Sequence, residues 1–168
     1  MMESKATTIP MDTHFKLLAA TSSELVDITM YHQIIGSLIY LMNTRPDICF
    51  VVNTLSQYLV EPRHVHLVST KHVMRYLKGT VDYGLNFSGD HDFRLFGFSD
   101  SNWARSVADR KSTSSGCFNL GSGMISWLSK KKSNVALSTA EAEYIVACSA
   151  SCEVVWLRKL LSCLFRLE

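Results

Sequence analysis

The spacing of apolar residues changes once along the chain, and this change constrains the fold more than any other feature. Apolar side chains recur every three or four residues, the period of an amphipathic helix, in residues 31–43, 46–59 and 64–77. Pro46 is expected to begin the second of these helices and Gly79 to cap the third. From residue 84 onward the pattern alternates in short stretches, as it does in strands. The pattern therefore predicts a helical first part and a mixed second part.

The second part contains the signals of a small antiparallel sheet followed by one long helix. Strands are expected at residues 94–99, 116–120 and 124–128, and a helix at 139–165. A Gly-Ser-Gly turn between the last two strands indicates a hairpin. The predicted fold class is α/β (α+β). Its expected divisions are an extended lead-in at 1–28, a helical segment at 29–80 and a sheet-and-helix segment at 81–168.

Charge and hydropathy narrow the choice of partners. The net charge of +2 does not by itself indicate a nucleic-acid-binding protein. Lys130, Lys131 and Lys132 form a run, with Arg105 and Arg110 upstream, and this patch is either a phosphate contact or an ordinary solvated loop. The most apolar stretch is too short to cross a membrane, and the start has no apolar signal segment. We therefore expect no membrane partner and an intracellular location, cytoplasmic or nuclear.

The cysteines show no pattern of a metal site or a disulfide framework. There are five, an odd number, at positions 49, 117, 148, 152 and 163. Cys148 and Cys152 are one helical turn apart, a spacing that suits small buried side chains. We expect all five to be reduced thiols.

Two glutamates near the start of the long helix have different predicted roles. Ser138 and Glu141 have the spacing of a capping box. In this motif the Ser hydroxyl accepts a hydrogen bond from the Glu backbone N–H, and the Glu carboxylate accepts one from the Ser backbone N–H. Stepping back along the apolar stripe of this helix by three or four residues leads from Ala147 to Glu143. Since a carboxylate at the head of an apolar stripe is costly unless it binds something, Glu143 is the candidate ligand and Glu141 the cap.

Six segments carry a resemblance to a known family. They are TRPDICFVVNTLSQY (44–58), HVMRYLKGTVDYGL (72–85), GFSDSNWA (97–104), DRKSTSSG (109–116), GMISWLSKKKSNVALSTAEAEY (123–144) and WLRKLL (156–161). In this order they resemble the copia-type retrotransposon Pol polyprotein, and the similarity runs from about Thr8 to Leu161. The resemblance implies that residues 29–80 are the end of a reverse transcriptase. It also implies that the chain from about residue 93 begins a ribonuclease H domain, which cuts the RNA of an RNA–DNA hybrid with two Mg²⁺ ions.

Such hydrolysis needs clustered carboxylates that hold two metal ions about 3.5–4 Å apart. By the resemblance, Asp100 at the end of the first strand is the first choice as a ligand. On sequence alone, a turn aspartate that caps the end of the strand explains it better. Strand alternation places it with Phe96 and Phe98, and we expect this face to lie under the long helix, toward Glu143. The family usually has Asp where Asn102 stands.

Further contacts are expected around the second strand. Ser112, Thr113 and Ser114 are either contacts to a nucleic-acid backbone or turn residues. With the lysine run they would hold RNA or an RNA–DNA hybrid.

The resemblance also implies a third carboxylate, on a strand after the long helix, and the given sequence ends before it. We therefore expect little or no nuclease activity from this chain alone, and an exposed edge on its first strand. By ancestry its partner is the rest of a Pol polyprotein.

Two alternatives remain open. One is a non-catalytic module that binds RNA or hybrid. The other is a secreted effector acting on host proteins in a plant cell, because Arg75-Tyr76-Leu77-Lys78 resembles, in degenerate form, the Arg-x-Leu-Arg signature of oomycete effectors.

Overall fold

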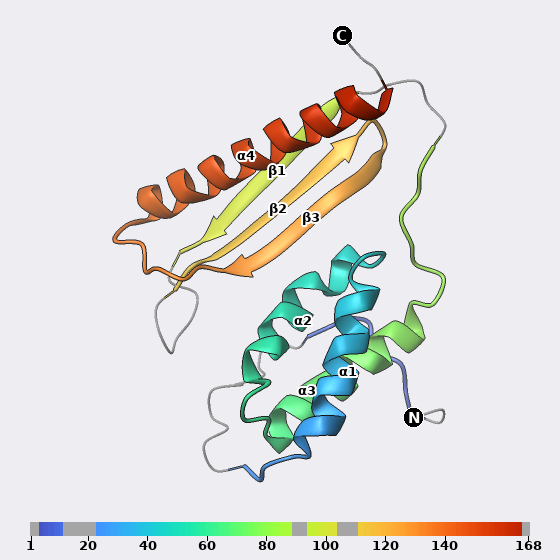
Figure 1. Cartoon of the computed structure of the whole chain (residues 1–168). Helices are drawn as coiled ribbons and strands as arrows, with labels where there is room; N and C mark the ends of the chain where they lie inside the picture. Colours follow the sequence, from blue (N-terminus) through green and yellow to red (C-terminus); the bar gives the residue numbers. More distant parts are fainter. Residues whose placement is uncertain (1–3, 12–22, 89–93, 104–110, 166–168) are drawn as a thin grey trace. The chain divides into compact units, whose positions relative to one another are not determined.

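The chain folds into two compact units, Met1–Gly84 and Leu85–Glu168. The structure is a computed structural model that describes residues 4–11, 23–88, 94–103 and 111–165. The first unit is helical, and the second holds a three-stranded antiparallel sheet and a long helix (Figure 1). The predicted α/β class, with helices before the sheet, is confirmed.

The described residues of the first unit form three α-helices: α1 (Ile28–Leu41), α2 (Cys49–Leu55) and α3 (His64–Gly79). Single 3-10 turns at Pro46–Ile48 and Ser56–Tyr58 flank α2. The apolar faces predicted from the sequence meet in one core, whose fully buried members are Tyr31, Ile35, Ile48, Val52, Leu55 and Val73.

Local chemistry explains where two of these helices begin. The Asp27 carboxylate accepts a hydrogen bond from the Thr29 backbone N–H at 2.8 Å, so α1 starts three residues earlier than the apolar period indicates. At the start of α3, His66 Nδ1 accepts from the Arg63 backbone N–H at 3.0 Å.

The predicted role of Gly79 as a helix cap is wrong. Gly79 is the last residue of α3, and the capping position is Thr80, with a φ of −132°. A built Cβ at Gly79 would lie 3.0 Å from the Ala6 side chain, so this glycine allows a close approach of the N-terminal segment.

The second unit orders its strands β1-β2-β3: β1 (Leu95–Asn102), β2 (Thr113–Leu120) and β3 (Gly123–Lys131). The β2–β3 hairpin turns at Gly121, which has a φ of 56°, a value that favours glycine. All three described strands are longer than predicted. Because β1 pairs only with β2 among the described strands, it is an edge strand of the described sheet.

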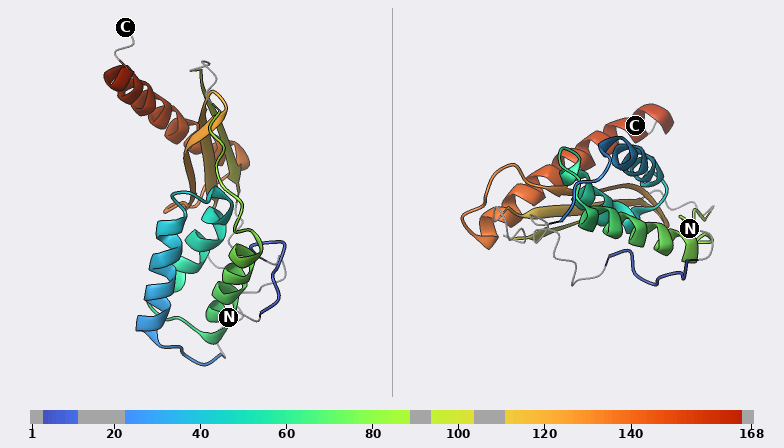
Figure 2. Two further views of the ribbon diagram at one scale, coloured as in Figure 1. Left: turned by 90° about the vertical axis from the view of Figure 1, so that its right-hand side faces the viewer. Right: turned by 90° about the horizontal axis from the view of Figure 1, so that it is seen from below.

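Helix α4 (Thr139–Phe165) covers one face of this sheet and forms a layer of its own (Figure 2). Phe118 on β2 is fully buried, and a Cβ built on its partner Gly97 would lie 3.5 Å from Val154 of α4. On the same face, Ser126 donates a hydrogen bond to the Glu153 carboxylate at 3.0 Å. The helix therefore lies on the face that carries Gly97 and Phe118.

Candidate functional site

The start of α4 is held by the predicted capping pair. Ser138 Oγ accepts a hydrogen bond from the Glu141 backbone N–H at 3.1 Å. The Glu141 carboxylate accepts from the backbone N–H of Leu137 at 2.6 Å, one residue earlier than the capping box predicts. Glu141 therefore satisfies a backbone donor at the helix start and is committed to that structural role.

Glu143 is exposed beside the buried stripe of α4, and the prediction that it heads this stripe is wrong. The buried residues of α4 are Ala142, Val146 and Leu157, whereas Ala147 is exposed. The true stripe thus begins one residue before Glu143, about 100° around the helix. The Glu143 carboxylate is therefore exposed to solvent, so its charge carries no burial cost that a bound ion would have to offset.

Asp100 lies on the opposite face of the sheet from the one predicted. It is three residues from Gly97 in β1, so the two side chains point to opposite faces. Phe96 and Phe98, which share the face of Asp100, are 42% and 63% exposed and do not pack under α4. Asp100 therefore projects from the uncovered face, and the expectation that it points toward α4 is wrong.

Both carboxylates nevertheless belong to the same end of the second unit. Strand β1 ends at Asn102, and the indole N–H of the next residue, Trp103, donates to the Ala136 carbonyl at 3.0 Å. Ala136 stands just before the start of α4. The end of β1 that carries Asp100 thus meets the end of α4 that carries Glu143.

The carboxylates at this end of the second unit are suitable ligands for a hard cation such as Mg²⁺, but they are too few to form a complete site. Carboxylate oxygens are the ligands that Mg²⁺ prefers, and within the described residues neither Asp100 nor Glu143 is engaged in an ion pair or a hydrogen bond through its side chain. The described part of the chain contains no group of three or more His, Cys, Asp or Glu residues placed to hold a metal. Asp100 and Glu143 are therefore two potential ligands of an incomplete set.

The three hydroxyl residues predicted to contact nucleic acid differ in how deeply they are buried. Ser112 and Ser114 are 2% and 3% exposed, so in this arrangement they do not offer their hydroxyls to an external ligand. Thr113 is half-buried and pairs with Asn102, on the face that carries Asp100. Thr113 and Ser114 lie within β2, so they are not turn residues.

The lysine run does not form a single patch. Lys130 and Lys131 are consecutive in β3 and point to opposite faces of the sheet, Lys131 to the face of Asp100. Lys132 follows the strand, and its Nζ lies 3.3 Å from Ser149 Oγ on α4. The upstream basic residues 105 and 110 lie outside the described residues. Only Lys131 thus shares a face with the candidate carboxylate of β1.

Sequence reasoning missed a buried polar network in the helical unit. Arg45, which is 7% exposed, forms two hydrogen bonds to the Asp47 carboxylate (3.0 and 2.7 Å) and donates to the Thr80 carbonyl and hydroxyl (2.9 and 2.7 Å). The Tyr76 hydroxyl donates to Asp47 at 2.7 Å. Burial raises the pKa of Asp47, but the hydrogen bonds from Arg45 and Tyr76 outweigh it, and the net pKa is lowered. The residue order offered no signal, because Thr80 is 35 positions from Arg45.

The segment Arg75-Tyr76-Leu77-Lys78, which resembles the effector signature, lies within α3. Tyr76 is buried in the network just described, and Lys78, which is exposed, donates to the Ser4 carbonyl at 2.9 Å. A receptor that reads this segment as an extended peptide would have to unfold the end of α3.

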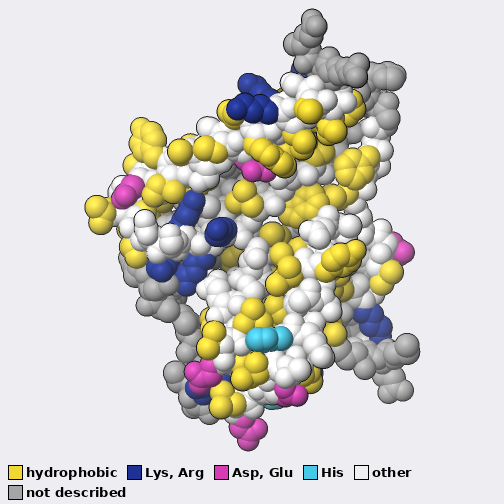
Figure 3. Space-filling view, in the orientation of Figure 1, with side chains coloured by type: hydrophobic (Ala, Val, Ile, Leu, Met, Phe, Trp, Pro, Cys, Tyr) yellow, Lys and Arg dark blue, Asp and Glu magenta, His cyan; other side chains and the backbone are white. Residues whose placement is uncertain are grey.

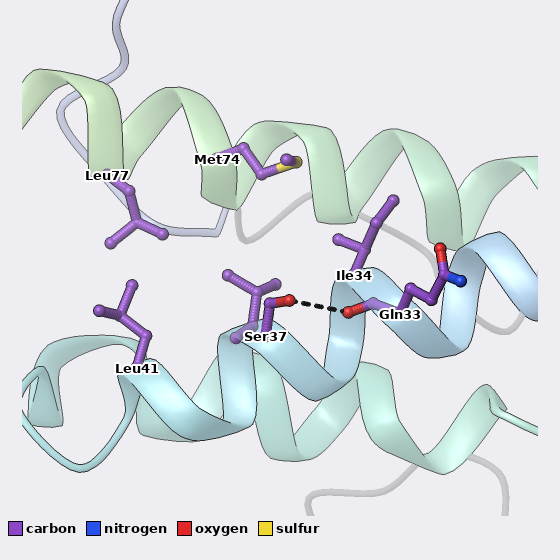
Figure 4. Close-up of a pocket in the computed structure, with 7 residues that line it drawn as sticks. Gln33, Ile34, Ser37, Leu41, Met74 and Leu77 are labelled. Atoms are coloured by element: carbon purple, nitrogen blue, oxygen red, sulfur yellow. Dashed lines mark hydrogen bonds between the residues drawn. The ribbon is translucent and has the colours of Figure 1, made fainter.

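A shallow apolar groove of about 430 Å³ lies between α1 and α3 (Figure 4). Its lining has no charged side chain, and the hydroxyl of Ser37, one of the lining residues, already donates to the Gln33 carbonyl at 2.9 Å. The groove thus lacks the groups that acid–base or metal chemistry needs. None of the helices that the structure describes has the length and apolarity needed to span a bilayer.

Comparison with known proteins places the chain in a family. It is 40% identical, over 96% of its length, to the Retrovirus-related Pol polyprotein from transposon RE2 of Arabidopsis thaliana. It is 37% identical, again over 96% of its length, to the corresponding polyprotein from transposon TNT 1-94 of Nicotiana tabacum. The chain spans 11% and 13% of these two polyproteins. The chain belongs to the copia-type retrotransposon Pol polyprotein family.

A further relative carries a different name. The chain is 44% identical over 128 residues to a protein of Plasmopara viticola named Secreted RxLR effector protein 161, and it covers 90% of that protein. No family model matches the chain, and no solved structure matches it.

Proposed function

We propose that the second unit is the first part of a ribonuclease H domain and that Asp100 and Glu143 are its metal ligands. The observation that carries this proposal is the meeting of the two ends that bear them, joined by the Trp103–Ala136 hydrogen bond. Membership of the Pol family supports it, since the resemblance assigns this stretch to the ribonuclease H portion. The helical unit would then be the end of the reverse transcriptase.

Within this proposal, the exposure of both carboxylates has a direct chemical meaning. Each is free of competing side-chain partners among the described residues, and each can turn toward a ligand in solvent. Two Mg²⁺ ions, when bound, would supply activation of water and stabilisation of the leaving oxygen. Glu141 cannot exchange roles with Glu143, because its carboxylate is bonded to the Leu137 N–H.

Substrate contact would fall on the uncovered face of the sheet. That face carries Asp100, Thr113 and Lys131, whereas Lys130 faces the helix side. An RNA–DNA hybrid laid on this face would meet a cation and a hydroxyl next to the candidate ligand, and a cation there neutralises backbone phosphates.

We further propose that the 168-residue chain does not cleave on its own, because two carboxylates do not complete a two-metal site. The test uses two proteins: this chain, and this chain extended by the segment that follows the matched region in the transposon RE2 polyprotein. With a labelled RNA–DNA hybrid and Mg²⁺, the extended protein should cleave and the shorter chain should not.

Paired substitutions identify the ligands in the extended protein. Asp100→Asn and Glu143→Gln should each abolish cleavage, whereas Glu141→Gln should retain it, because an amide oxygen can still accept the cap hydrogen bond. Full activity of the Glu143→Gln variant would contradict the ligand assignment. Cleavage by the unextended chain, lost in the Asp100→Asn variant, would contradict the claim of inactivity.

A second candidate function rests on the Plasmopara viticola relative. This relative is named as a secreted effector, and the chain covers 90% of it. We propose as the alternative that the chain acts on host proteins after secretion. A secretion and uptake assay of a tagged chain in an oomycete–plant system tests this, with Arg75→Ala and Lys78→Ala as variants. Retention of the chain inside the producing cell would exclude this alternative.

A further inference from the structure

An exposed row of side chains runs along α4 at intervals of four residues. It begins with Tyr144, Cys148, Cys152 and Trp156, all of them exposed, and apolar side chains gather along this helix (Figure 3). The expectation that the two cysteines are buried is therefore wrong. Both are free thiols on one face of the helix, between two aromatic rings.

The spacing of the two cysteines suits a shared metal ion. Residues four apart on a helix have Cβ atoms about 5–6 Å apart. With a metal–sulfur bond of about 2.3 Å, as for zinc, two sulfurs on one metal ion lie less than about 4.6 Å apart, within reach of two such side chains. Neither position in the helix need change for both thiolates to bind one ion.

The number of ligands selects the kind of ion. Thiolates are soft ligands and prefer soft metals such as monovalent copper and zinc. Structural zinc sites take four protein ligands, and among the described residues no third His, Cys, Asp or Glu joins Cys148 and Cys152. We propose that Cys148 and Cys152 form a two-thiolate site for one Cu⁺ ion, which accepts two sulfur ligands in a near-linear arrangement.

The charge around this pair is compatible with the resulting complex. Two thiols that bind one Cu⁺ release two protons, so the bis-thiolate complex carries a net charge of −1. Lys132 Nζ lies 3.3 Å from Ser149 Oγ, and Ser149 is on the same turn of α4 as the cysteine pair. A lysine from the end of β3 thus places a positive charge at the residue that follows Cys148.

The full chain can be tested by anaerobic competition for Cu⁺ with bicinchoninate, whose copper complex is coloured. The wild-type chain should take up one equivalent of Cu⁺. The Cys148→Ser/Cys152→Ser variant should bind more weakly by more than the about 10- to 100-fold that a change outside the ligand shell causes. Cys163→Ser is the matched control, since Cys163 is exposed on the same helix and has no cysteine four residues away.

Alkylation mapping of the wild-type chain gives an independent readout. In the presence of one equivalent of Cu⁺, Cys148 and Cys152 should be protected from iodoacetamide while Cys163 reacts. Equal competition by the wild type and the double variant would overturn the proposal. So would protection of Cys163 alone, or uptake of one ion per two chains.

Discussion

Replacing Arg45 by Met removes the centre of the buried polar network while keeping most of the side-chain volume. Arg45 joins the segment after α1 to the residue after α3, because its guanidinium donates to both the carbonyl and the hydroxyl of Thr80. It also forms an ion pair with Asp47. The substitution therefore leaves a buried carbonyl without its donor and a carboxylate without its cation.

The magnitude follows from what is left unpaired. A hydrogen bond to a charged group contributes about 1.5–3 kcal/mol, and an unpaired buried polar group costs about 1–3 kcal/mol. The Asp47 side chain is 32% exposed, so water replaces part of the lost ion pair, and its share is small. We therefore expect Arg45→Met to lower the free energy of unfolding of the helical unit by about 3 kcal/mol.

Hydrogen exchange measured peptide by peptide can locate this loss. Backbone amides of α2 and α3 should lose protection equivalent to about 3 kcal/mol. The three tryptophans, Trp103, Trp127 and Trp156, all lie in the second unit, so their emission in urea should follow that unit and stay unchanged. The control is Arg158→Met, an exposed arginine on α4. A loss below about 1 kcal/mol in α3 would refute the argument that the network stabilises this unit.

The same network predicts how stability depends on acid. The folded pKa of Asp47 is lowered, so its contribution is present above the unfolded pKa of about 3.9 and is lost as the pH falls through the lower folded value. The wild-type helical unit should lose stability below about pH 4, and Asp47→Asn should flatten this part of the curve. An unchanged acid limb in Asp47→Asn would show that other groups control it.

Five further substitutions test the packing and the caps. Burial raises the pKa of Tyr31 to about 12, so its contribution is present below about pH 10 and lost as the pH rises to about 12; Tyr31→Phe should remove this alkaline unfolding, seen by circular dichroism. Gly97→Ala should destabilise by about 1–3 kcal/mol, since its Cβ would lie 2.9 Å from a buried ring, whereas Gly36→Ala in α1, with open space around it, should stabilise by about 1 kcal/mol in urea titrations. Glu141→Ala should lower the melting temperature by the loss of about 0.5–1 kcal/mol of capping, and Glu143→Ala should leave it nearly unchanged.

Much of the fold was predictable because its signals are local. The helical period, the prolines and the Gly-Ser-Gly turn fixed the kind and order of the elements, and the Ser138–Glu141 spacing identified the cap correctly. The ends of the elements were less accurate: α1 begins earlier and β2 is longer than predicted, because a cap and strand pairing add residues that carry no apolar period.

The candidate site depended on contacts that local patterns do not contain. Alternation shows that Asp100 shares a face with Phe98, but it does not show which face a helix will cover. Helix α4 covers the face that carries Gly97 and the fully buried Phe118, with Val154 close to Gly97, and this left Asp100 on the open side. The buried stripe of α4 likewise begins one residue earlier than predicted. Ala142 is buried, whereas Glu143 is exposed.

The sequence by itself therefore determined the order of the elements and the family, and it singled out Asp100 and Glu143 as candidate ligands. Only the tertiary structure decided that the lysine run is divided between the two faces of the sheet and that Cys148 and Cys152 are both exposed. It also decided that Arg45 donates hydrogen bonds to Thr80, which links the segment after α1 to the end of α3. The physical reason is range. Periodicity and capping act over a few residues, whereas burial is decided by side chains that are distant in sequence and compete for the same space.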